Sequence, residues 1–478
     1  MQTDDEYFDS TEFRDILAAY EESVSSGAPI FLDTDDLIDI ADYYTFYGYK
    51  DKAAAAVDAA LDLAPGAVLP LVYKAREALT AGDVEAARRY SSEINDKEDP
   101  DYKFLQAEIM VACDLIDKAD RYLDLLFEDT EEEEKENFKY DTANMYLEYG
   151  VYDKALEWIE RCEDFMDCDV MDIRGRSLLG LERYDDCVST YNTLLDYNPR
   201  SVKYWATLAN AQFMKEDYSE ALSSSEFALA LDPKDAGCMM IKANSLCRLG
   251  NFETALEFYR RYNKAMPNDA CGELNMGKCL MQMERYEEAL AHLRRAAVLG
   301  DSTDESLMSD TFETLAFAYS ALGDPDSAVR YIDKAFDAEG NPDNPELFVM
   351  RGHILLENGR HGEARSMFRH AAIKSGYSPK VILRIIVSLL DNGYTKRAYI
   401  MFKLFFKYAG SGFSDAYSYM ALCCWQLKKG REFLKYLRKA VGHNPQEAKS
   451  VLGGIIPADM TAEEFLKDIT DKLNIERK

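Results

Sequence analysis

One sequence pattern recurs along most of the chain at a spacing close to 34 residues. The stretch DYSEALSSSEFALALDP begins at Asp217, and 34 residues later it is followed by NFETALEFYRRYNKAMP and, after 34 more, by RYEEALAHLRRAAVLG. A repeat of this length is one supersecondary unit, which cannot bury its apolar face alone. Successive units must therefore stack on one another, and this limits the chain to a repeat architecture.

Eleven of the twelve units place a small apolar residue at the same point, which we call the anchor, and in the last unit Phe433 replaces it. Five of the eleven intervals between successive anchors are 34 residues, and the others lie between 32 and 39. The twelve anchors are Ala53, Ala87, Ala119, Ala155, Cys187, Ala221, Ala255, Ala289, Ala328, Ala364, Ala398 and Phe433.

The pattern resembles the tetratricopeptide repeat family over about residues 31–445. The residues that match the family pattern within one unit are Trp205, Leu208, Ala209, Tyr218, Ala221, Ala228 and Pro233. Gly175, Gly277 and Gly352 fill the small-residue position of other units, where helices have to approach closely. The resemblance implies two antiparallel helices per unit, with the first helix of each unit lining a concave groove.

We therefore predict an all-α solenoid of about twelve antiparallel helix pairs, stacked into a right-handed superhelix. Residues 1–30 should form an N-terminal capping helix, and residues 446–478 should form C-terminal capping helices, the second with a capping box at Thr461 and Glu464. Glycines are expected at the turns between the two helices of a unit: Gly48, Gly82, Gly150, Gly250, Gly323, Gly359 and Gly393.

The ten cysteines are scattered among expected helix-core positions, and no two have the CxxC spacing of a structural zinc site. We interpret them as small buried hydrophobic residues in a reducing compartment. The sequence also has no phosphate-binding glycine loop, HExxH motif or nucleophile elbow. We therefore expect no catalytic residues, no bound metal and no cofactor.

A row of polar residues is predicted to line the groove. In five consecutive units the same position, which faces the groove in the family, is occupied by Asn144, Arg176, Asn210, Asn244 and Lys278. An Asn side chain offers an acceptor and two donors, which match the backbone of an extended peptide. The alternative is that these side chains are only a solvated helix face.

Lys380 and Arg384 are four residues apart and therefore share one helical face. They match two of the positions with which some members of the family hold a terminal carboxylate. The remaining positions of that clamp are occupied by Glu313, Phe317 and Met350 and do not match. The pair is therefore interpreted as a general anion contact.

Charge is unevenly distributed along the chain. The formal net charge is −32, of which residues 1–200 carry −31, whereas residues 351–450 carry +12. Such a distribution would steer basic partners to one part and acidic partners to the other. It also permits self-association between copies. The alternative is that acidic runs such as EDTEEEEKE (128–136) only keep the molecule in solution.

The function that these features favour is a non-catalytic scaffold, which holds an extended segment of a partner protein in its concave groove. The alternative is a structural assembly subunit that associates end to end through its acidic and basic halves. A nucleic-acid-binding repeat is disfavoured, because the acidic half would repel phosphates. The acidic start of the chain and the absence of a long apolar stretch predict a cytoplasmic protein without a membrane partner.

Overall fold

The computed structural model is all-α and divides into two compact units, Met1–Glu216 (unit 1) and Asp217–Lys478 (unit 2). The residues that it describes are 7, 8, 10–27, 29, 31–164, 166–300, 304–338, 343–408, 413, 416–457 and 460–475, with side chains up to residue 470. No strand occurs among these residues, and the predicted fold class is confirmed. That residues 31–445 form one continuous solenoid remains a prediction.

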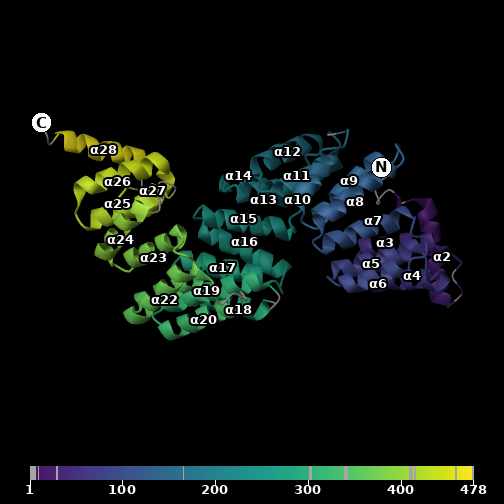
Figure 1. Ribbon diagram of the computed structural model, residues 1–478, viewed down its shortest axis with the longest axis horizontal. Helices are drawn as coiled ribbons and strands as arrows, with labels where there is room; N and C mark the ends of the chain where they lie inside the picture. The colour runs from purple at the N-terminus through teal and green to yellow at the C-terminus, as the bar shows by residue number, and fades with distance from the viewer. Residues whose placement is uncertain are drawn as a thin grey trace. The chain divides into compact units, whose positions relative to one another are not determined.

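Unit 1 is a stack of antiparallel helix pairs, coloured purple to blue-green in Figure 1. Its helices are α2 (Thr11–Ser26), α3 (Thr34–Phe46), α4 (Lys50–Leu63), α5 (Val68–Thr80), α6 (Val84–Glu93), α7 (Pro100–Ala112), α8 (Ile116–Asp129), α9 (Lys135–Glu148), α10 (Tyr152–Ile159), α11 (Cys168–Gly180), α12 (Tyr184–Tyr197) and α13 (Val202–Met214).

Unit 2 is built in the same way, and its colours run from teal to yellow. Its helices are α14 (Tyr218–Leu231), α15 (Ala236–Arg248), α16 (Phe252–Ala265), α17 (Ala270–Gln282), α18 (Tyr286–Leu299), α19 (Glu305–Ala321), α20 (Pro325–Ala338), α21 (Pro345–Glu357), α22 (His361–Lys374), α23 (Pro379–Asp391), α24 (Thr395–Tyr408), α25 (Ala416–Gln426), α26 (Gly430–His443), α27 (Pro445–Val451) and α28 (Ala462–Ile475).

The anchors are the points at which the helices meet. All twelve are buried, and none is more than 3% exposed. The predicted close contacts at the small-residue position are also present: a Cβ atom built on Gly175 would lie 2.7 Å from the ring of Tyr191, and one built on Gly277 would lie 2.4 Å from Leu293. A larger residue at either position would push the paired helices apart.

The turn inside each helix pair requires one residue with positive φ. The seven predicted turn glycines all have φ between 72° and 81°. The same position, five residues before the anchor, has φ between 58° and 66° in the other five units, where it is occupied by Asp114, Glu182, Glu216, Glu284 and Lys428. The backbone geometry is therefore kept even where the sequence lacks glycine.

Helices α2, α27 and α28 precede and follow the repeats along the chain, and their role as caps remains a prediction. Within the predicted N-terminal cap of residues 1–30, helix α2 packs on α3 and α4 through the buried rings of Phe13 and Tyr20. Residues 1–6, 9, 28 and 30 of that cap lie outside the described residues. At the other end the capping box is confirmed: the Thr461 N–H donates to Glu464 Oε2 at 2.8 Å, and the Glu464 N–H donates to Thr461 Oγ1 at 3.2 Å.

The cysteines are free thiols, and six of the ten are buried. Burial raises the pKa of Cys187 and of Cys423 to about 12 and that of Cys424 to about 11. These thiols are therefore neutral near pH 7 and behave as small apolar side chains. None of the helices in the described ranges is both long enough and apolar enough to cross a membrane.

The non-glycine turns make a prediction about stability. An L-residue at positive φ lowers the stability of the folded state by roughly 1–2 kcal/mol. Replacing it with glycine removes this strain, but glycine also loses more chain entropy on folding, which offsets part of the stabilisation. We expect Glu182→Gly to stabilise unit 1 by about 0.5–1 kcal/mol, measured by urea unfolding followed by circular dichroism. Gly250→Ala should have the opposite effect on unit 2, and an unchanged or lowered urea midpoint for Glu182→Gly would contradict the prediction.

Candidate functional site

The groove position lies eleven residues before the anchor, on the first helix of each pair. In unit 1 it is occupied by Asp42, Arg76, Glu108, Asn144, Arg176 and Asn210. The sequence analysis selected the last three of these and missed Arg76 and Glu108. Both lie eleven residues before their anchors, Ala87 and Ala119, and this spacing identifies them. Their charged side chains differ from the asparagines on which the prediction was based.

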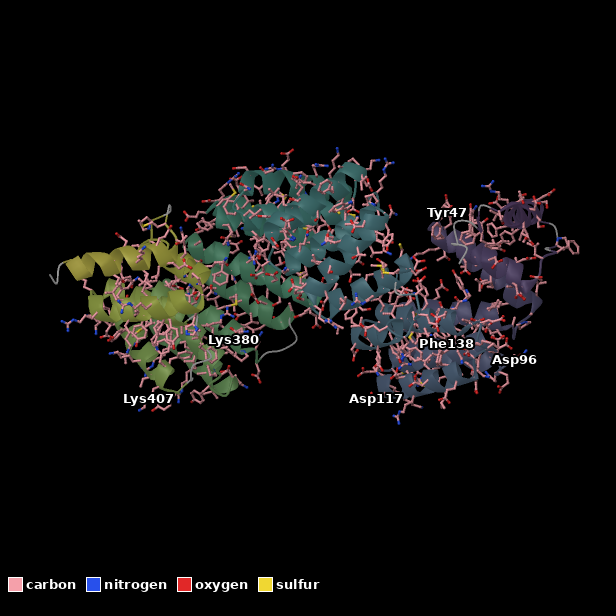
Figure 2. All side chains as sticks on the ribbon, turned by 90° about the horizontal axis from the view of Figure 1, so that it is seen from above. Tyr47, Asp96, Asp117, Phe138, Lys380 and Lys407 are labelled. Atoms are coloured by element: carbon pink, nitrogen blue, oxygen red, sulfur yellow. The ribbon has the colours of Figure 1, made fainter. Side chains whose placement is uncertain are left out.

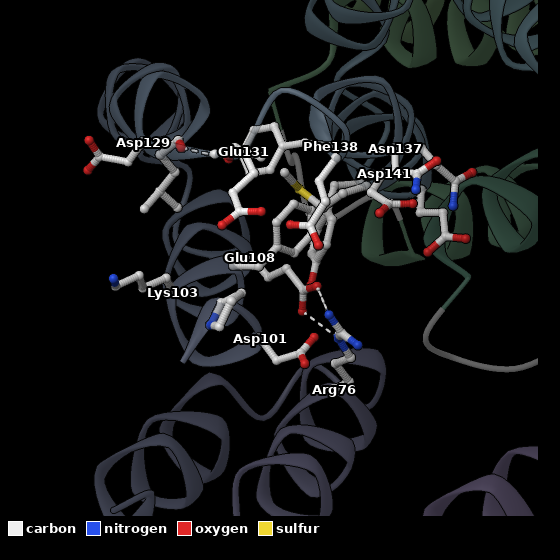
Figure 3. A pocket seen from close by; sticks show the side chains of 18 of the residues that line it. Arg76, Asp101, Lys103, Glu108, Asp129, Glu131, Asn137, Phe138 and Asp141 are labelled. Carbon is white, nitrogen blue, oxygen red and sulfur yellow. Dashed lines mark hydrogen bonds and ion pairs between the residues drawn. The ribbon is translucent and has the colours of Figure 1, made fainter. Parts of the chain in front are cut away.

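A cavity of about 1000 Å³ opens in unit 1, and Arg76, Glu108 and Asn144 line it. Figure 3 labels Arg76 and Glu108 in this cavity. Its walls come from α5, α7, α8 and α9, together with the segments that precede α7 and α9. Three successive groove positions thus open into a single space. Residues of three successive repeats therefore line the cavity.

Acidic residues dominate the cavity wall. The acidic side chains are Glu98, Asp101, Glu108, Asp129, Glu131, Glu134, Asp141 and Glu148. The basic side chains are Arg76 and Lys103, and each is already paired with a glutamate: Lys103 Nζ lies 2.9 Å from Glu98 Oε2. The remaining carboxylates therefore leave the cavity with a strongly negative charge.

Arg76 joins two successive groove positions. Its Nε atom lies 3.0 Å from Glu108 Oε1 and 3.1 Å from Oε2, and its Nη2 atom lies 2.8 Å from Oε1. The Glu108 side chain is only 8% exposed, whereas that of Arg76 is 47% exposed. A buried carboxylate needs such a partner, and the bidentate geometry fixes the direction of both side chains.

Two aspartates near this ion pair are held in an environment that disfavours their charge. Burial raises the pKa of Asp101, and the nearby Arg76 opposes that effect only in part, since Asp99 raises the pKa further. Burial likewise raises the pKa of Asp141, with Arg76 opposing and Asp101 adding to the effect. Figure 3 shows Asp101 beside the Arg76 and Glu108 pair. A cation entering the cavity would relieve this unfavourable charge.

One part of the cavity is apolar. Phe104 on α7 and Phe138 on α9 meet edge to face with their ring centroids 6.0 Å apart, and Leu126 and Met145 also line the wall. Beside them, Tyr149 has a pKa raised to about 12 by burial and by the charge of Glu108. The cavity can therefore take an apolar group as well as a cation.

Asn144 brings a free amide to this cavity. Its side chain is half-buried, and it forms no hydrogen bond to any residue that the structure describes. Arg176 on α11 and Asn210 on α13 are also half-buried and have no polar partner within the described ranges. Neither belongs to the cavity wall around Asn144.

In unit 2 the predicted groove residues are used inside the protein. The Tyr259 hydroxyl donates to Asn244 Oδ1 at 2.7 Å, and Lys278 on α17 forms an ion pair with Asp310 on α19. Because long-range pairing is not visible in the repeat pattern, the sequence analysis could not identify either partner. Whether these side chains also contact a ligand remains a prediction.

Whether Lys380 and Arg384 contact an anion remains a prediction. Both residues lie on α23, but Arg384 is paired with Glu346 on α21, whereas Lys380 is exposed (Figure 2). One carboxylate therefore already occupies the guanidinium group. In the described part of the chain, no group of three or more His, Cys, Asp or Glu side chains has the arrangement of a metal site.

Three family models match the chain. The model described as anaphase-promoting complex, cyclosome, subunit 3 matches residues 214–296, and two models described as tetratricopeptide repeat match residues 268–338 and residues 174–235 with 314–379. Together they cover the central repeats of the sequence pattern.

Curated relatives match smaller parts of the chain. Protein FlbA of Caulobacter vibrioides is 29% identical over 216 residues, which are 39% of this chain and 35% of that protein. Tetratricopeptide repeat protein 8 of Caenorhabditis elegans is 22% identical over 232 residues, 48% of this chain and 45% of that protein. The chain thus spans less than half the length of either relative. Among solved structures, a chain of the Cut9-Hcn1 hetero-tetramer is 12% identical with a TM-score of 0.38, covering 93% of each chain.

The ion pair of Arg76 and Glu108 makes a prediction about the integrity of the cavity. Arg76→Ala leaves the buried Glu108 carboxylate without its partner, which should destabilise unit 1 by about 2 kcal/mol, less than for a fully buried pair because Arg76 is half-exposed. The double variant Arg76→Ala/Glu108→Gln should recover most of this loss. Urea unfolding of the wild type and the three variants, including Glu108→Gln, measures the coupling, and additive effects would contradict it.

Proposed function

Because the chain belongs to the tetratricopeptide repeat family, whose repeats are protein-interaction scaffolds, we propose that the cavity of unit 1 holds an extended segment of a partner protein. The observation that carries this proposal is the opening of three successive groove positions, Arg76, Glu108 and Asn144, into one cavity. No catalytic role is assigned to any residue of the cavity.

The Asn144 amide supplies the contact to the ligand backbone. A peptide in extended conformation presents alternating N–H and C=O groups, and a primary amide can pair with both. Neither the amide N–H groups nor the carbonyl oxygen of Asn144 forms a hydrogen bond to a described residue. It can therefore hold a segment through its backbone with little dependence on sequence.

The carboxylates give this segment its charge preference. The two basic side chains of the wall are paired with Glu108 and Glu98, so Asp101, Asp141 and Glu148 are left to act on a ligand. Charge-assisted hydrogen bonds from Arg or Lys to carboxylates are stronger than neutral ones, and complementary charge also speeds association. The preferred segment carries at least one Arg or Lys side chain.

The aromatic part of the wall adds an apolar contact. Phe104 and Phe138 lie in the same cavity as these carboxylates, so an apolar side chain near the basic one would be buried on binding. The segment that fits both features combines a basic side chain with a neighbouring aliphatic or aromatic one. Such a combination gives specificity that charge alone cannot give.

Peptide selection tests this proposal. We expect a random twelve-residue phage-displayed library, selected on the full chain, to be enriched in Arg or Lys beside an apolar residue. Selected peptides should bind the variant Asp141→Asn/Asn144→Ala at least tenfold more weakly, corresponding to about 1.4 kcal/mol, in a fluorescence anisotropy titration.

The matched control is Asp153→Asn/Asn192→Ala. It makes the same two chemical changes at exposed positions of α10 and α12 that do not line the cavity. It should retain wild-type affinity. Equal losses in both variants, or selected peptides without basic residues, would count against the cavity as the binding site.

The raised pKa values of Asp101 and Asp141 predict how binding depends on pH. A basic ligand requires these groups to be ionised, and they take up protons at a higher pH than an ordinary aspartate does. Affinity for a selected Arg peptide should therefore fall as the pH is lowered from 7 toward 4. Asp141→Asn should flatten this dependence; a profile identical to that of the wild type would show that Asp141 does not contribute.

A further inference from the structure

Helices α24 and α26 of unit 2 carry a surface that the proposed groove function does not use. Between them they contain eight Lys and Arg residues and one acidic residue. The basic residues are Lys396, Arg397, Lys403, Lys407, Arg431, Lys435, Arg438 and Lys439. We call the exposed side of these two helices the basic face.

The two helices lie side by side. The Tyr399 hydroxyl on α24 donates to Glu432 on α26 at 2.7 Å, and the rings of Phe406 and Tyr436 stack with their centroids 5.7 Å apart. Residues of equivalent position, Lys403 and Arg438 among them, therefore form one continuous surface across two repeats. Figure 2 labels Lys407 on this surface.

Among the described residues, little negative charge opposes the basic face. Its one acidic side chain, Glu432, accepts from Tyr399 and lies 3.5 Å from Lys403 and 3.9 Å from Lys429. The hydrogen bond from Tyr399, with the two lysines, lowers the pKa of Glu432. Lys396, Lys407 and Lys435 have no ion-pair partner among the described residues.

An exposed apolar stripe runs beside the lysines of α24. Ile400 is 59% exposed, Leu404 is 52% exposed and Tyr408 is 76% exposed. At 100° per residue these three side chains follow one side of the helix, and Lys396, Lys403 and Lys407 follow the adjacent side. Exposed apolar residues scattered singly need no explanation, but three at helical spacing beside a row of cations form a patterned surface.

Cations and apolar groups together narrow the range of partners. The phosphates of a nucleic acid would pair with the cations. Its backbone offers no apolar group to contact the exposed stripe on α24. A lipid surface would favour apolar side chains across the whole face, whereas the exposed residues of α26 between Gly430 and Asn444 are charged or polar, apart from its glycines. A single helix with acidic residues on one side and apolar residues on the other satisfies both stripes of α24.

We propose that the basic face docks an acidic amphipathic helix of a partner protein. Its apolar side chains cover Ile400, Leu404 and Tyr408, and its carboxylates pair with Lys396, Lys403 and Lys407. Arg431, Lys435, Arg438 and Lys439 extend the attraction beyond the contact and steer the partner toward it. This surface lies on the second helices of two repeats in unit 2, and none of its residues lines the cavity of unit 1.

The test uses the full chain and a synthetic probe. The probe is a fluorescein-labelled peptide of eighteen residues with Leu at every third or fourth position and Glu elsewhere, and its affinity is measured by anisotropy at 150 mM salt. A second peptide, in which Ser replaces each Leu, has the same charge. We expect the first peptide to bind at least tenfold more tightly than the second.

Two variants separate the contributions of charge and apolar contact. Lys396→Glu/Lys407→Glu and Ile400→Gln/Leu404→Gln should each weaken binding of the Leu-containing peptide at least tenfold. All four positions are exposed, so the variants should remain fully helical by circular dichroism. The matched control is Lys234→Glu/Lys264→Glu, which makes the same charge change at two exposed lysines elsewhere in unit 2 that have no ion-pair partner among the described residues. It should bind as the wild type does.

Several results would overturn the proposal. Equal losses in the control and in Lys396→Glu/Lys407→Glu would mean that only the overall charge acts. Binding of phosphatidylserine vesicles or of double-stranded RNA, abolished by the same variant while the peptide fails to bind, would assign the face to another class of partner. Loss of a concentration-dependent dimer in that variant, seen by sedimentation, would make a second copy of the chain the occupant.

Discussion

Burial of one small residue per repeat is the constraint on which the rest of this structure depends. Every anchor is buried, and it is an alanine or a cysteine in eleven of the twelve repeats. Close packing at this point fixes the rotation of the first helix about its own axis. The residue eleven positions earlier therefore occupies the same place on the first helix of each repeat, whatever its chemistry.

The residues that pack the helices together differ from those that form the exposed surfaces. One chain can therefore carry an acidic cavity and a basic face on the same kind of repeat. The anchors, the tight glycine contacts and the positive-φ turns recur in both units. The groove positions and the outer faces vary freely, because they do not take part in this packing. Unit 1 can therefore carry an acidic cavity, and α24 and α26 of unit 2 a basic face, without a change of fold.

The fold could be read from the sequence because periodicity records packing. The anchors, the seven glycine turns, the tight positions at Gly175 and Gly277, and the capping box at Thr461 all follow from local rules and all appear in the structure. The pairing of side chains in the candidate site could not be predicted in the same way. Arg76 and Glu108 form a pair across 32 residues, and Lys278 finds Asp310 across another 32. Which charged side chains pair depends on their lengths and on the directions in which neighbouring repeats point them. The repeat period of the sequence contains no information on either.

The buried cysteines have a practical consequence. Cys187 lies in the core of unit 1 and Cys423 in that of unit 2, and burial keeps both thiols protonated. A thiol reacts as its thiolate, so neither can be alkylated until the helices around it separate. The alkylation rate of each thiol therefore measures how often the helices around it separate. Cys187 and Cys423 thus report local unfolding in the native chain without any introduced residue.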